Sequence, residues 1–241
     1  MPKVAVILPA AGQSTRFKLG QQKKVFTELK GRAIWLRSAE HFVNRDDVVQ
    51  TIVAISPDDD EFFRNKFRPN LAFMAVDLVH GGDSRAETVK NALAQVSDDA
   101  DFVAVHDAAR PMLTAKWVDQ IFNAAFETGA AIPAVPVANT LKRVDGKVIT
   151  DTIDRTGLWG AQTPQVFRRE ILEQAYQAAS DMDATDEAQL VRNIGHPVQV
   201  VEGSSMNFKI TTTSDFKMAE ALIDRLPREK PSFLHPFKDD V

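Results

Sequence analysis

Short apolar runs alternate along the chain with segments of helical periodicity. The runs are rich in β-branched residues, which favour strands. The expected strands are Val4–Leu8, Val48–Ser56, Ala75–His80, Asp101–Val105 and Ala130–Val137. This alternation is typical of an α/β domain, because neighbouring parallel strands need a crossover connection. The pattern predicts a mostly parallel sheet flanked by helices, in a single domain over residues 1–226 with a tail rich in Pro, Lys and Asp over residues 227–241.

The expected helices carry an apolar face and recognisable end signals. One begins after the N-capping residue Thr114 and ends near Gly129. Its apolar face consists of Trp117, Val118, Ile121, Phe122, Ala125 and Phe126, a spacing that fits a packed core rather than a cofactor site. Further helices are expected over residues 168–179, 185–194 and 214–226.

One segment interrupts the α/β alternation. Residues 140–144 and 147–153 read as two short strands around Asp145-Gly146, a strong signal for a tight hairpin turn. We interpret residues 136–159 as a projecting β arm. Because an isolated two-stranded ribbon is only marginally stable in water, the arm should pack against a second subunit. The alternative is that it folds back on its own domain.

Composition limits the classes of function. The chain has 241 residues, 44% of them hydrophobic, which is enough for a large core. Its net charge of −4 argues against a nucleic-acid binder but allows a basic pocket for a phosphorylated ligand. The absence of cysteine excludes disulfides and thiolate chemistry. No apolar segment approaches the roughly 20 residues of a membrane span, so we expect a cytoplasmic protein without membrane partners.

The loop after the first predicted strand has the composition of a phosphate site. It reads Pro9-Ala-Ala-Gly-Gln-Ser-Thr-Arg16, and Lys23-Lys24 follow it. Small side chains let backbone N–H groups approach phosphate oxygens, and the cations neutralise the remaining charge. The segment matches neither the Walker pattern nor a dinucleotide fingerprint. An ordinary strand-to-helix turn is the alternative reading.

Two further clusters follow predicted strands, where ligands bind in open α/β sheets. Residues 81–85, Gly-Gly-Asp-Ser-Arg, give backbone access to a flat base, unless Asp83 or Ser84 simply caps a helix. Residues 106–111, His-Asp-Ala-Ala-Arg-Pro, place a carboxylate at a strand end with small residues beside it. We expect His106 to be a structural residue rather than a general base.

The last two clusters contain one cation each. Arg155 lies in Asp154-Arg-Thr-Gly-Leu-Trp159, shortly before Gln162-Thr-Pro-Gln165, and its guanidinium suits bidentate phosphate binding. Lys209 lies in Asn207-Phe-Lys-Ile-Thr211, which we expect to form a short alternating strand, and it can reach a phosphate as a point charge. Taken separately, each would be a solvated surface charge.

Six motifs occur in order along the chain. They are P-A-A-G-x-S-x-R, G-G-D-x-R-A, V-H-D-A-A-R-P, D-R-x-G-L-W with Q-T-P-Q, T-D-E-A at residues 185–188, and N-F-K-I-T. Together they closely resemble the 2-C-methyl-D-erythritol 4-phosphate cytidylyltransferase family from Val4 to about Leu226. The resemblance implies a Rossmann-like nucleotidyltransferase fold and a homodimer built through the β arm. It also implies transfer of CMP from CTP to methylerythritol phosphate in non-mevalonate isoprenoid precursor biosynthesis, with release of pyrophosphate.

The resemblance also implies roles for individual residues. Arg16 and Lys24 would stabilise charge on the reacting phosphates, and Arg155 and Lys209 would orient the nucleophile. The implied substrate-binding residues are Pro9, Ala10, Ala11, Gly12, Gly82, Asp83, Thr88, Asp107, Arg110, Thr140 and Thr163. Thr140 and Arg155 would enter the site from the other subunit's arm. Mg²⁺ or another divalent cation would bind mainly through the CTP phosphates, with Asp107 as a candidate ligand.

The chain departs from the family pattern at the second cation. Relatives usually have Pro-Lys-Gln before an aromatic residue, whereas this chain has Lys23-Lys24-Val25-Phe26. The spacing to Phe26 favours Lys24 as the catalytic lysine, and counting from Arg16 favours Lys23. Two other functions stay open: a ribitol 5-phosphate cytidylyltransferase, which differs in the polyol pocket, and a catalytically inactive CTP-binding dimer.

Overall fold

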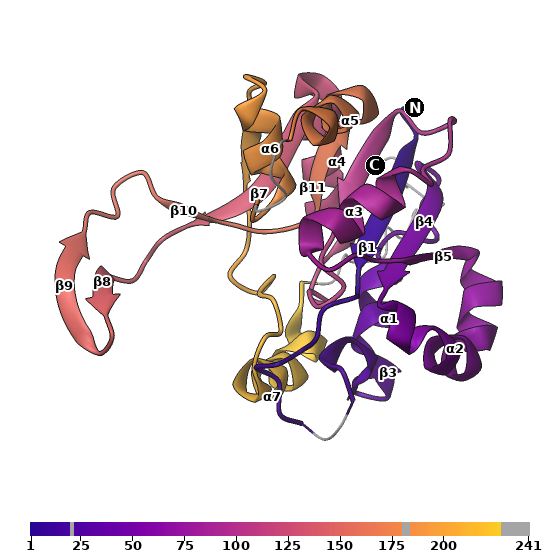
Figure 1. Cartoon of the computed structure of the whole chain (residues 1–241), viewed down its shortest axis with the longest axis horizontal. Coiled ribbons are helices and arrows are strands. Elements are labelled where there is room, and N and C mark those ends of the chain that lie inside the picture. The colour runs from indigo at the N-terminus through magenta and orange to yellow at the C-terminus, as the bar shows by residue number, and fades with distance from the viewer. Residues whose placement is uncertain (20–21, 180–183, 228–241) are drawn as a thin grey trace, which may run out of the picture.

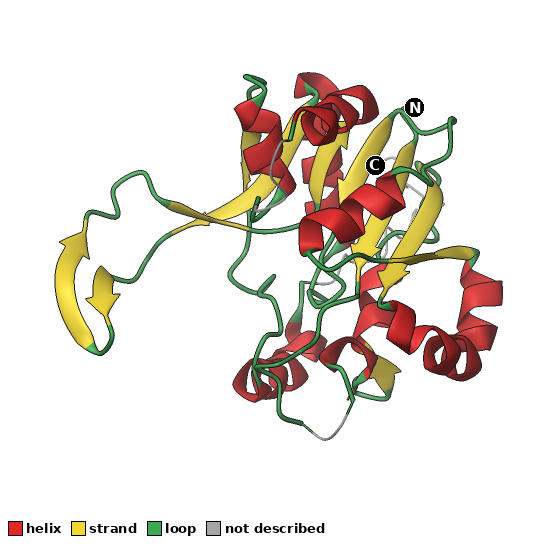
Figure 2. Ribbon diagram, in the orientation of Figure 1, coloured by secondary structure: helices red, strands yellow, loops and turns green. Residues whose placement is uncertain are grey.

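A mixed sheet of eight strands forms the centre of the domain (Figure 2). The computed structural model describes residues 1–19, 22–179 and 184–227. The strand order is β10-β7-β11-β6-β1-β4-β5, and β12 pairs with β7. The strands are β1 (Val4–Pro9), β4 (Val48–Ile55), β5 (Val76–His80), β6 (Phe102–Val105), β7 (Ala130–Pro136), β10 (Trp159–Ala161), β11 (Gln165–Arg168) and β12 (Gln199–Glu202). The predicted α/β fold class is confirmed.

The four predicted strands nearest the N-terminus form a continuous parallel block at one side of this sheet. β1 lies between β4 and β6, and β5 borders β4, all in parallel register. The side chains of Val4, Val6 and Leu8 pack on one face of the sheet, whereas Ala5 and Ile7 pack on the other. A strand covered on both faces is apolar at successive positions, which explains the unbroken hydrophobic run.

Three strands of this sheet were not predicted from the sequence, whereas the strand expected over residues 207–211 is not formed. β11 runs antiparallel to β6 and β7, and β10 runs antiparallel to β7, whereas β12 is parallel to β7. β11 begins at Gln165, directly after Thr163 and Pro164. These strands are too short to show a clear period of two, and only their pairing defines them.

Helices cover both faces of the sheet. They are α1 (Ile34–Ala39), α2 (Asp60–Met74), α3 (Arg85–Leu93), α4 (Ala115–Thr128), α5 (Arg169–Ala178), α6 (Glu187–Asn193) and α7 (Thr213–Leu222). One core contains side chains of α1, α2 and α4, and a second contains side chains of α3, α5 and α6. A third, smaller core joins α7 to Phe17 and Ile210.

The predicted helix ends agree with the structure at several caps. The Trp117 N–H donates to Thr114 Oγ1 at 3.3 Å, and Gly129 ends α4 with a φ of +86°. The helix expected over residues 214–226 ends at Leu222, and a 3₁₀ turn, η3 (Ile223–Arg225), follows. Apart from Pro227, the predicted tail lies outside the described residues.

Smaller elements complete the fold. A two-stranded pair, β2 (Glu28–Leu29) and β3 (Arg32–Ala33), precedes α1, and two 3₁₀ turns are η1 (Lys24–Phe26) and η2 (Pro57–Asp59). No helix within the described ranges is both long and apolar enough to cross a bilayer.

The predicted β arm stands clear of the domain (Figure 1). β8 (Leu141–Asp145) pairs with β9 (Val148–Ile153), and Gly146 has the positive φ of +57° that the tight turn requires. The apolar side chain of Val148 is 68% exposed. The alternative in which the arm folds back on its own domain is therefore wrong.

Candidate functional site

A cavity of about 360 Å³ opens at the carboxyl ends of the central parallel strands. Its lining comes from the loops that follow β1, β4, β5 and β6, with Lys24 and Lys209 from more distant segments. The predicted site residues that line it are Pro9, Ala10, Ala11, Gly12, Lys24, Gly82, Asp83, Thr88, Asp107 and Lys209. These predicted positions thus lie around one space, although they come from segments far apart in the sequence.

The loop after β1 is tied at both ends. The Ala10 N–H donates to the Ala54 carbonyl at 2.7 Å, which continues the pairing of β1 with β4. Ser14 has a φ of +56°, and its Oγ accepts a hydrogen bond from the Lys24 N–H at 3.1 Å. Between these ties, Gly12 is exposed and open space surrounds the position of a Cβ atom. A ligand oxygen can therefore approach the backbone N–H groups.

The diglycine loop after β5 closes against the β1 loop. A Cβ atom on Gly81 would lie 2.7 Å from Thr88 Oγ1 and 2.8 Å from Ala11 Cβ, so only glycine fits this close approach. Thr88 Oγ1 accepts a hydrogen bond from the Gly82 N–H at 3.2 Å. Ser84, not Asp83, is the N-cap of α3. This leaves the Asp83 carboxylate at the cavity wall.

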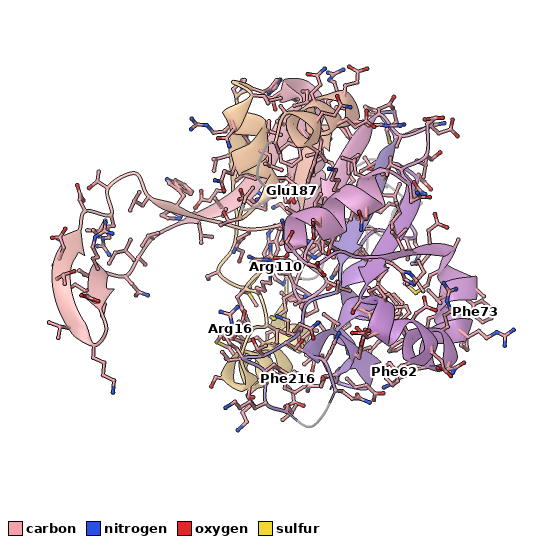
Figure 3. The ribbon with its side chains drawn as sticks, in the orientation of Figure 1. Arg16, Phe62, Phe73, Arg110, Glu187 and Phe216 are labelled. Atoms are coloured by element: carbon pink, nitrogen blue, oxygen red, sulfur yellow. The ribbon has the colours of Figure 1, made fainter. Side chains whose placement is uncertain are left out.

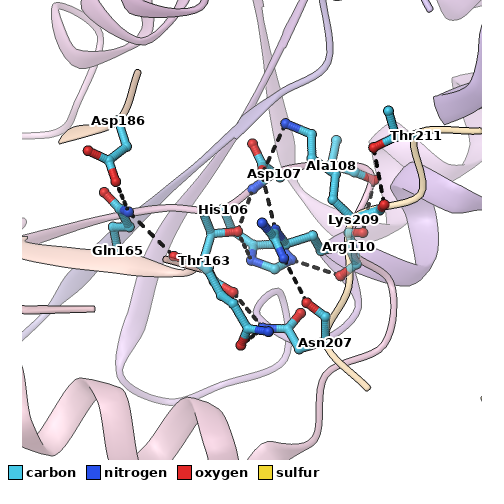
Figure 4. Close-up of polar contacts among 12 residues, drawn as sticks. His106, Asp107, Ala108, Arg110, Thr163, Gln165, Asp186, Asn207, Lys209 and Thr211 are labelled. Atoms are coloured by element: carbon cyan, nitrogen blue, oxygen red, sulfur yellow. Dashed lines mark hydrogen bonds and ion pairs between the residues drawn. The ribbon is translucent and has the colours of Figure 1, made fainter. Parts of the chain in front are cut away.

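Three cations surround the carboxylate of Asp107, at the end of β6. Figure 4 shows two of them, Lys209 and Arg110. Lys209 Nζ and Arg110 Nε each lie 3.1 Å from its Oδ2, and Arg85 Nε lies 3.5 Å from its Oδ1. Burial alone would raise the pKa of Asp107, but Lys209, Arg85 and Arg110 hold that pKa well below its usual range. The carboxylate is therefore ionised and fixes the positions of the three cations.

A buried histidine, His106, is linked to Asp107 through Thr163. His106 Nε2 lies 3.0 Å from the Arg110 carbonyl, and its Nδ1 lies 3.1 Å from Thr163 Oγ1. Burial lowers the pKa of His106 to about 3, so the ring is neutral: Nε2–H donates to the carbonyl and Nδ1 accepts from the Thr163 hydroxyl. Thr163 Oγ1 in turn accepts from the Asp107 N–H at 3.0 Å. Both ring nitrogens are thus occupied, as expected for a structural histidine.

Thr163 and Arg110 lie behind the cavity wall rather than on it. Thr163 is buried and holds the backbone of Asp107, and Arg110 Nη1 donates to the Asn207 carbonyl at 2.7 Å. The latter bond fixes the segment that carries Lys209. These two predicted substrate-binding residues therefore act on the cavity indirectly. Thr163 holds the backbone of Asp107, and Arg110 holds the Asp107 carboxylate and the segment of Lys209.

Sequence reasoning missed a buried network behind Arg85. The guanidinium of Arg85 forms two bonds with Glu187, at 2.7 and 2.9 Å, and the Tyr176 hydroxyl donates to the same carboxylate at 3.1 Å. Glu187 is 1% exposed. Arg85 and Glu187 stand in the G-G-D-x-R-A and T-D-E-A motifs, which are distant in sequence, and no local pattern joins them.

The two adjacent lysines point to different places. Lys24 lines the cavity, whereas Lys23 Nζ forms an ion pair with Asp59 Oδ2 at 2.7 Å. Burial and the neighbouring cations Lys209 and Arg16 lower the pKa of Lys24 to about 8. Of the two, Lys24 is the lysine that a ligand in the cavity meets.

Arg16 lies outside the cavity lining, on an exposed loop. The next residue, Phe17, is buried and its ring packs edge-on against Phe216 of α7, at 6.0 Å between centroids. Arg16 and Phe216 are labelled in Figure 3. Arg16 is close enough to Lys24 to lower the pKa of that lysine. The loop thus holds its cation at the rim of the site.

The remaining predicted site residues belong to the arm. Thr140 precedes β8 and Arg155 follows β9, and both are exposed. Neither lines the cavity of their own chain. A single copy of the chain therefore does not bring these two residues to the site.

The residues of the site do not form a metal centre of their own. Within the described ranges, no group of three or more His, Asp or Glu side chains is arranged to hold an ion. Asp107, the candidate ligand, has three cations within 3.5 Å, which compete with a metal for its oxygens. The protein part of the site thus fits bound anions better than a bare divalent cation.

Comparisons with known proteins point to one family. The profile of IspD, 2-C-methyl-D-erythritol 4-phosphate cytidylyltransferase, matches residues 4–225. The cytidylyltransferase of that name from Rhodopirellula baltica is 40% identical over 237 residues, covering 94% of this chain and 97% of the relative. The one from Bacillus pumilus is 38% identical over 222 residues, covering 91% and 96%.

Solved structures agree with the sequence comparisons. A crystal structure of 4-diphosphocytidyl-2C-methyl-D-erythritol synthase has a TM-score of 0.79 and 32% identity, covering 93% of this chain and 100% of that chain. The cytidylyltransferase from Thermus thermophilus has a TM-score of 0.76 and 31% identity, covering 92% and 99%. Because profile, sequences and structures agree over nearly the whole described domain, this chain belongs to the 2-C-methyl-D-erythritol 4-phosphate cytidylyltransferase family.

Proposed function

We propose that the cavity at the ends of β1 and β6 is where this chain transfers CMP from CTP to 2-C-methyl-D-erythritol 4-phosphate. Membership of the family makes the chain a nucleotidyltransferase of the non-mevalonate pathway. One observation carries the placement of the reaction: Lys24, Lys209 and Arg85 line a single cavity whose wall is the small-residue loop after β1. Two polyanionic substrates need such a concentration of positive charge.

The CTP side of the cavity is the wall formed by the β1 and diglycine loops. Backbone N–H groups of residues 11 and 12 bind the triphosphate, since small side chains leave them accessible. Ala10 lines this wall through its small side chain, because its N–H is bonded to the Ala54 carbonyl. Asp83 and the Gly82 carbonyl bind the cytosine, and Thr88 supports this loop by accepting the hydrogen bond of the Gly82 N–H. Lys24 and Arg16 neutralise charge on the α-phosphate and on the departing pyrophosphate.

The acceptor side is the cluster around Asp107. Lys209 exchanges part of its contact with Asp107 for the phosphate of methylerythritol phosphate, and Arg110 keeps the segment of Lys209 in place. An oxygen of this phosphate attacks the α-phosphorus of CTP in line, and the bond to pyrophosphate breaks, so pyrophosphate leaves with the electron pair. The attacking phosphate is already anionic, so no general base is needed, in agreement with the neutral, buried His106.

A divalent cation would be held by the phosphate oxygens of CTP rather than by a protein carboxylate. Such an ion supplies charge neutralisation between the phosphates. The cations Lys24, Arg16 and Lys209 provide the part of this neutralisation that belongs to the protein.

The arm completes the site of a second copy of the chain. Its exposed apolar side chains, among them Val144, Val148 and Ile149, are 51%, 68% and 59% accessible and need a partner surface. Thr140 and Arg155 flank this ribbon and do not line their own cavity. In a homodimer they enter the partner's polyol phosphate pocket, where Arg155 orients the nucleophile.

The test is pyrophosphate release by the purified chain with CTP and Mg²⁺. Parallel reactions contain 2-C-methyl-D-erythritol 4-phosphate, ribitol 5-phosphate or no acceptor. We expect release with the methylerythritol substrate in clear excess over the other two. Preference for ribitol 5-phosphate would overturn the proposed acceptor, and CTP binding without turnover on either polyol would indicate an inactive dimer.

A further inference from the structure

The segment that carries Lys24 is fastened to the start of α2 by the residue next to it. We propose that Lys23 is a positioning residue, whose ion pair with Asp59 holds Lys24 in the cavity. The inference rests on the proposed role of Lys24 in the reaction. The proposal gives a function to Lys23, the lysine of the pair that does not line the cavity.

The ion pair is short and largely shielded from solvent. Lys23 Nζ lies 2.7 Å from Asp59 Oδ2, and the two side chains are 18% and 14% exposed. Most other ion pairs on the described surface have one partner that is more exposed, for example Lys30 with Asp224 at 45% and 62%. Partial burial reduces screening by salt, so this pair constrains its residues more than an exposed pair does.

Asp59 is itself fixed relative to the cavity. It closes the 3₁₀ turn η2, which begins at Pro57, and its N–H donates to the Ser56 carbonyl at 2.9 Å. Ser56 and Asp58 both line the cavity. The ion pair therefore connects the Lys24 segment to a turn that is part of the cavity wall.

The backbone at Lys23 has the conformation that a proline would impose. Its φ is −60° and its ψ is 142°, and the 3₁₀ turn η1 starts at the next residue. A lysine has no ring to restrict φ, so the ion pair supplies the restriction that the ring would otherwise supply.

Lys24 needs such a restriction, because its surroundings repel it. Lys209 and Arg16 are like charges, and the attraction of Asp107 and Asp215 only partly offsets them. Other contacts also hold the segment. The Lys24 N–H donates to Ser14 Oγ, and the Thr27 hydroxyl donates to the Lys23 carbonyl at 3.4 Å. The buried Phe26 ring packs on α2, at 5.5, 5.6 and 6.2 Å between centroids from Phe62, Phe63 and Phe67. Among these contacts, the Lys23 ion pair is the one made by the side chain of the residue adjacent to Lys24.

Steady-state kinetics of four variants and one control variant test the proposal. Lys23→Gln and Asp59→Asn should each lower kcat about 10-fold, a typical effect of a small misplacement of a catalytic group. The double variant should be no slower than either single one, because both remove the same pair. Lys23→Pro should keep the wild-type kcat, since proline restores φ without the charge. Lys30→Gln, which removes a cation from the exposed pair, is the matched control and should leave kcat unchanged.

The pH profile separates positioning from a direct effect of charge. When the ion pair is lost, the Lys24 segment loosens and its ammonium is more exposed to water, which raises the pKa of Lys24. The fall in kcat/KM near pH 8 should therefore move to higher pH in both Lys23→Gln and Asp59→Asn. Coulomb's law alone predicts opposite shifts for the loss of a cation and the loss of an anion. Both variants keep the same charged groups facing Lys24, so these groups do not cause a difference between the two profiles. They are Lys209, Arg16, Asp107 and Asp215.

Three outcomes would overturn the proposal: a normal kcat in Asp59→Asn, limbs that shift in opposite directions, or a Lys23→Pro variant as slow as Lys23→Gln. Circular dichroism and thermal melting show whether each variant is folded. Lys24→Gln separates this proposal from the proposed function. If Lys24→Gln is as active as the wild type, the proposed role of Lys24 fails; if it is inactive while Lys23→Gln and Asp59→Asn are normal, only the positioning role fails.

Discussion

The charged side chains of the cavity have partners within the chain, whereas the apolar side chains of the β arm are exposed. Around Asp107, the ionised groups have partners within the chain, and Glu187 is buried with Arg85 and Tyr176. On the arm, Val148 and Ile149 are more than half exposed, and β8 pairs only with β9 among the described strands. The first region is preorganised by its own fold, whereas the second has unsatisfied apolar surface. A preorganised charge cluster binds charged ligands with little rearrangement, and the exposed apolar ribbon is the surface that the proposed dimer would cover.

The largest expected effect is on the cavity side. Arg16→Ala should lower kcat by about 10²- to 10³-fold, by analogy with the loss of one preorganised donor. Steady-state pyrophosphate release measures it, and Arg68→Ala, which removes an exposed cation from α2, is the control. Near-normal turnover in the Arg16 variant would remove this residue from the mechanism.

The next effect tests whether the arm serves another subunit. Arg155→Ala and Lys24→Gln should each lose activity, Arg155→Ala by about 10²-fold through misplacement of the nucleophile. If the two residues act in one site from different subunits, a refolded mixture of the two variants should recover about a quarter of wild-type activity, because half of the dimers contain one intact site. Each variant mixed with itself is the control. No recovery would place Arg155 in its own chain's site or outside the mechanism.

A stability effect is expected behind the cavity. Glu187→Ala removes the main partner of Arg85 and should destabilise the fold by about 3 kcal/mol, a typical effect of breaking a buried ion pair from one side. Chemical denaturation measures this difference. Glu202→Ala, on the edge strand β12, is exposed and should change stability by less than about 0.5 kcal/mol. Equal losses in the two variants would contradict the network.

The smallest expected effect is on pH dependence. The folded-state pKa of Lys24 is lowered to about 8, so the ammonium is present below this pH and lost above it. The kcat/KM for CTP should therefore fall above about pH 8, approaching tenfold per pH unit. Lys24→Arg should remove this limb, since a guanidinium keeps its charge. A limb that persists in Lys24→Arg would belong to another group.

Much of the fold could be predicted from the sequence because its signals are local. The buried run Val4–Leu8, the Thr114 cap and the Asp145-Gly146 turn each lie within a few residues, and the structure confirms the strand, the helix start and the hairpin. β11 and the short helix α1 were not predicted, because elements of four and six residues carry too few positions to show a period.

The features of the site also separate into those that the sequence predicts locally and those that depend on the folded structure. The sequence by itself determined which loops follow the strands and which cations they carry, since the spacing of the motifs and the succession of strands along the chain can be read from the residues. Only the tertiary structure decided that Lys24 enters the cavity while Lys23 pairs with Asp59, that Thr163 supports Asp107 from behind, and that Arg85 meets Glu187. These contacts join residues 36 to 102 positions apart, so the distance between their atoms depends on how the sheet orders its strands and not on any local pattern.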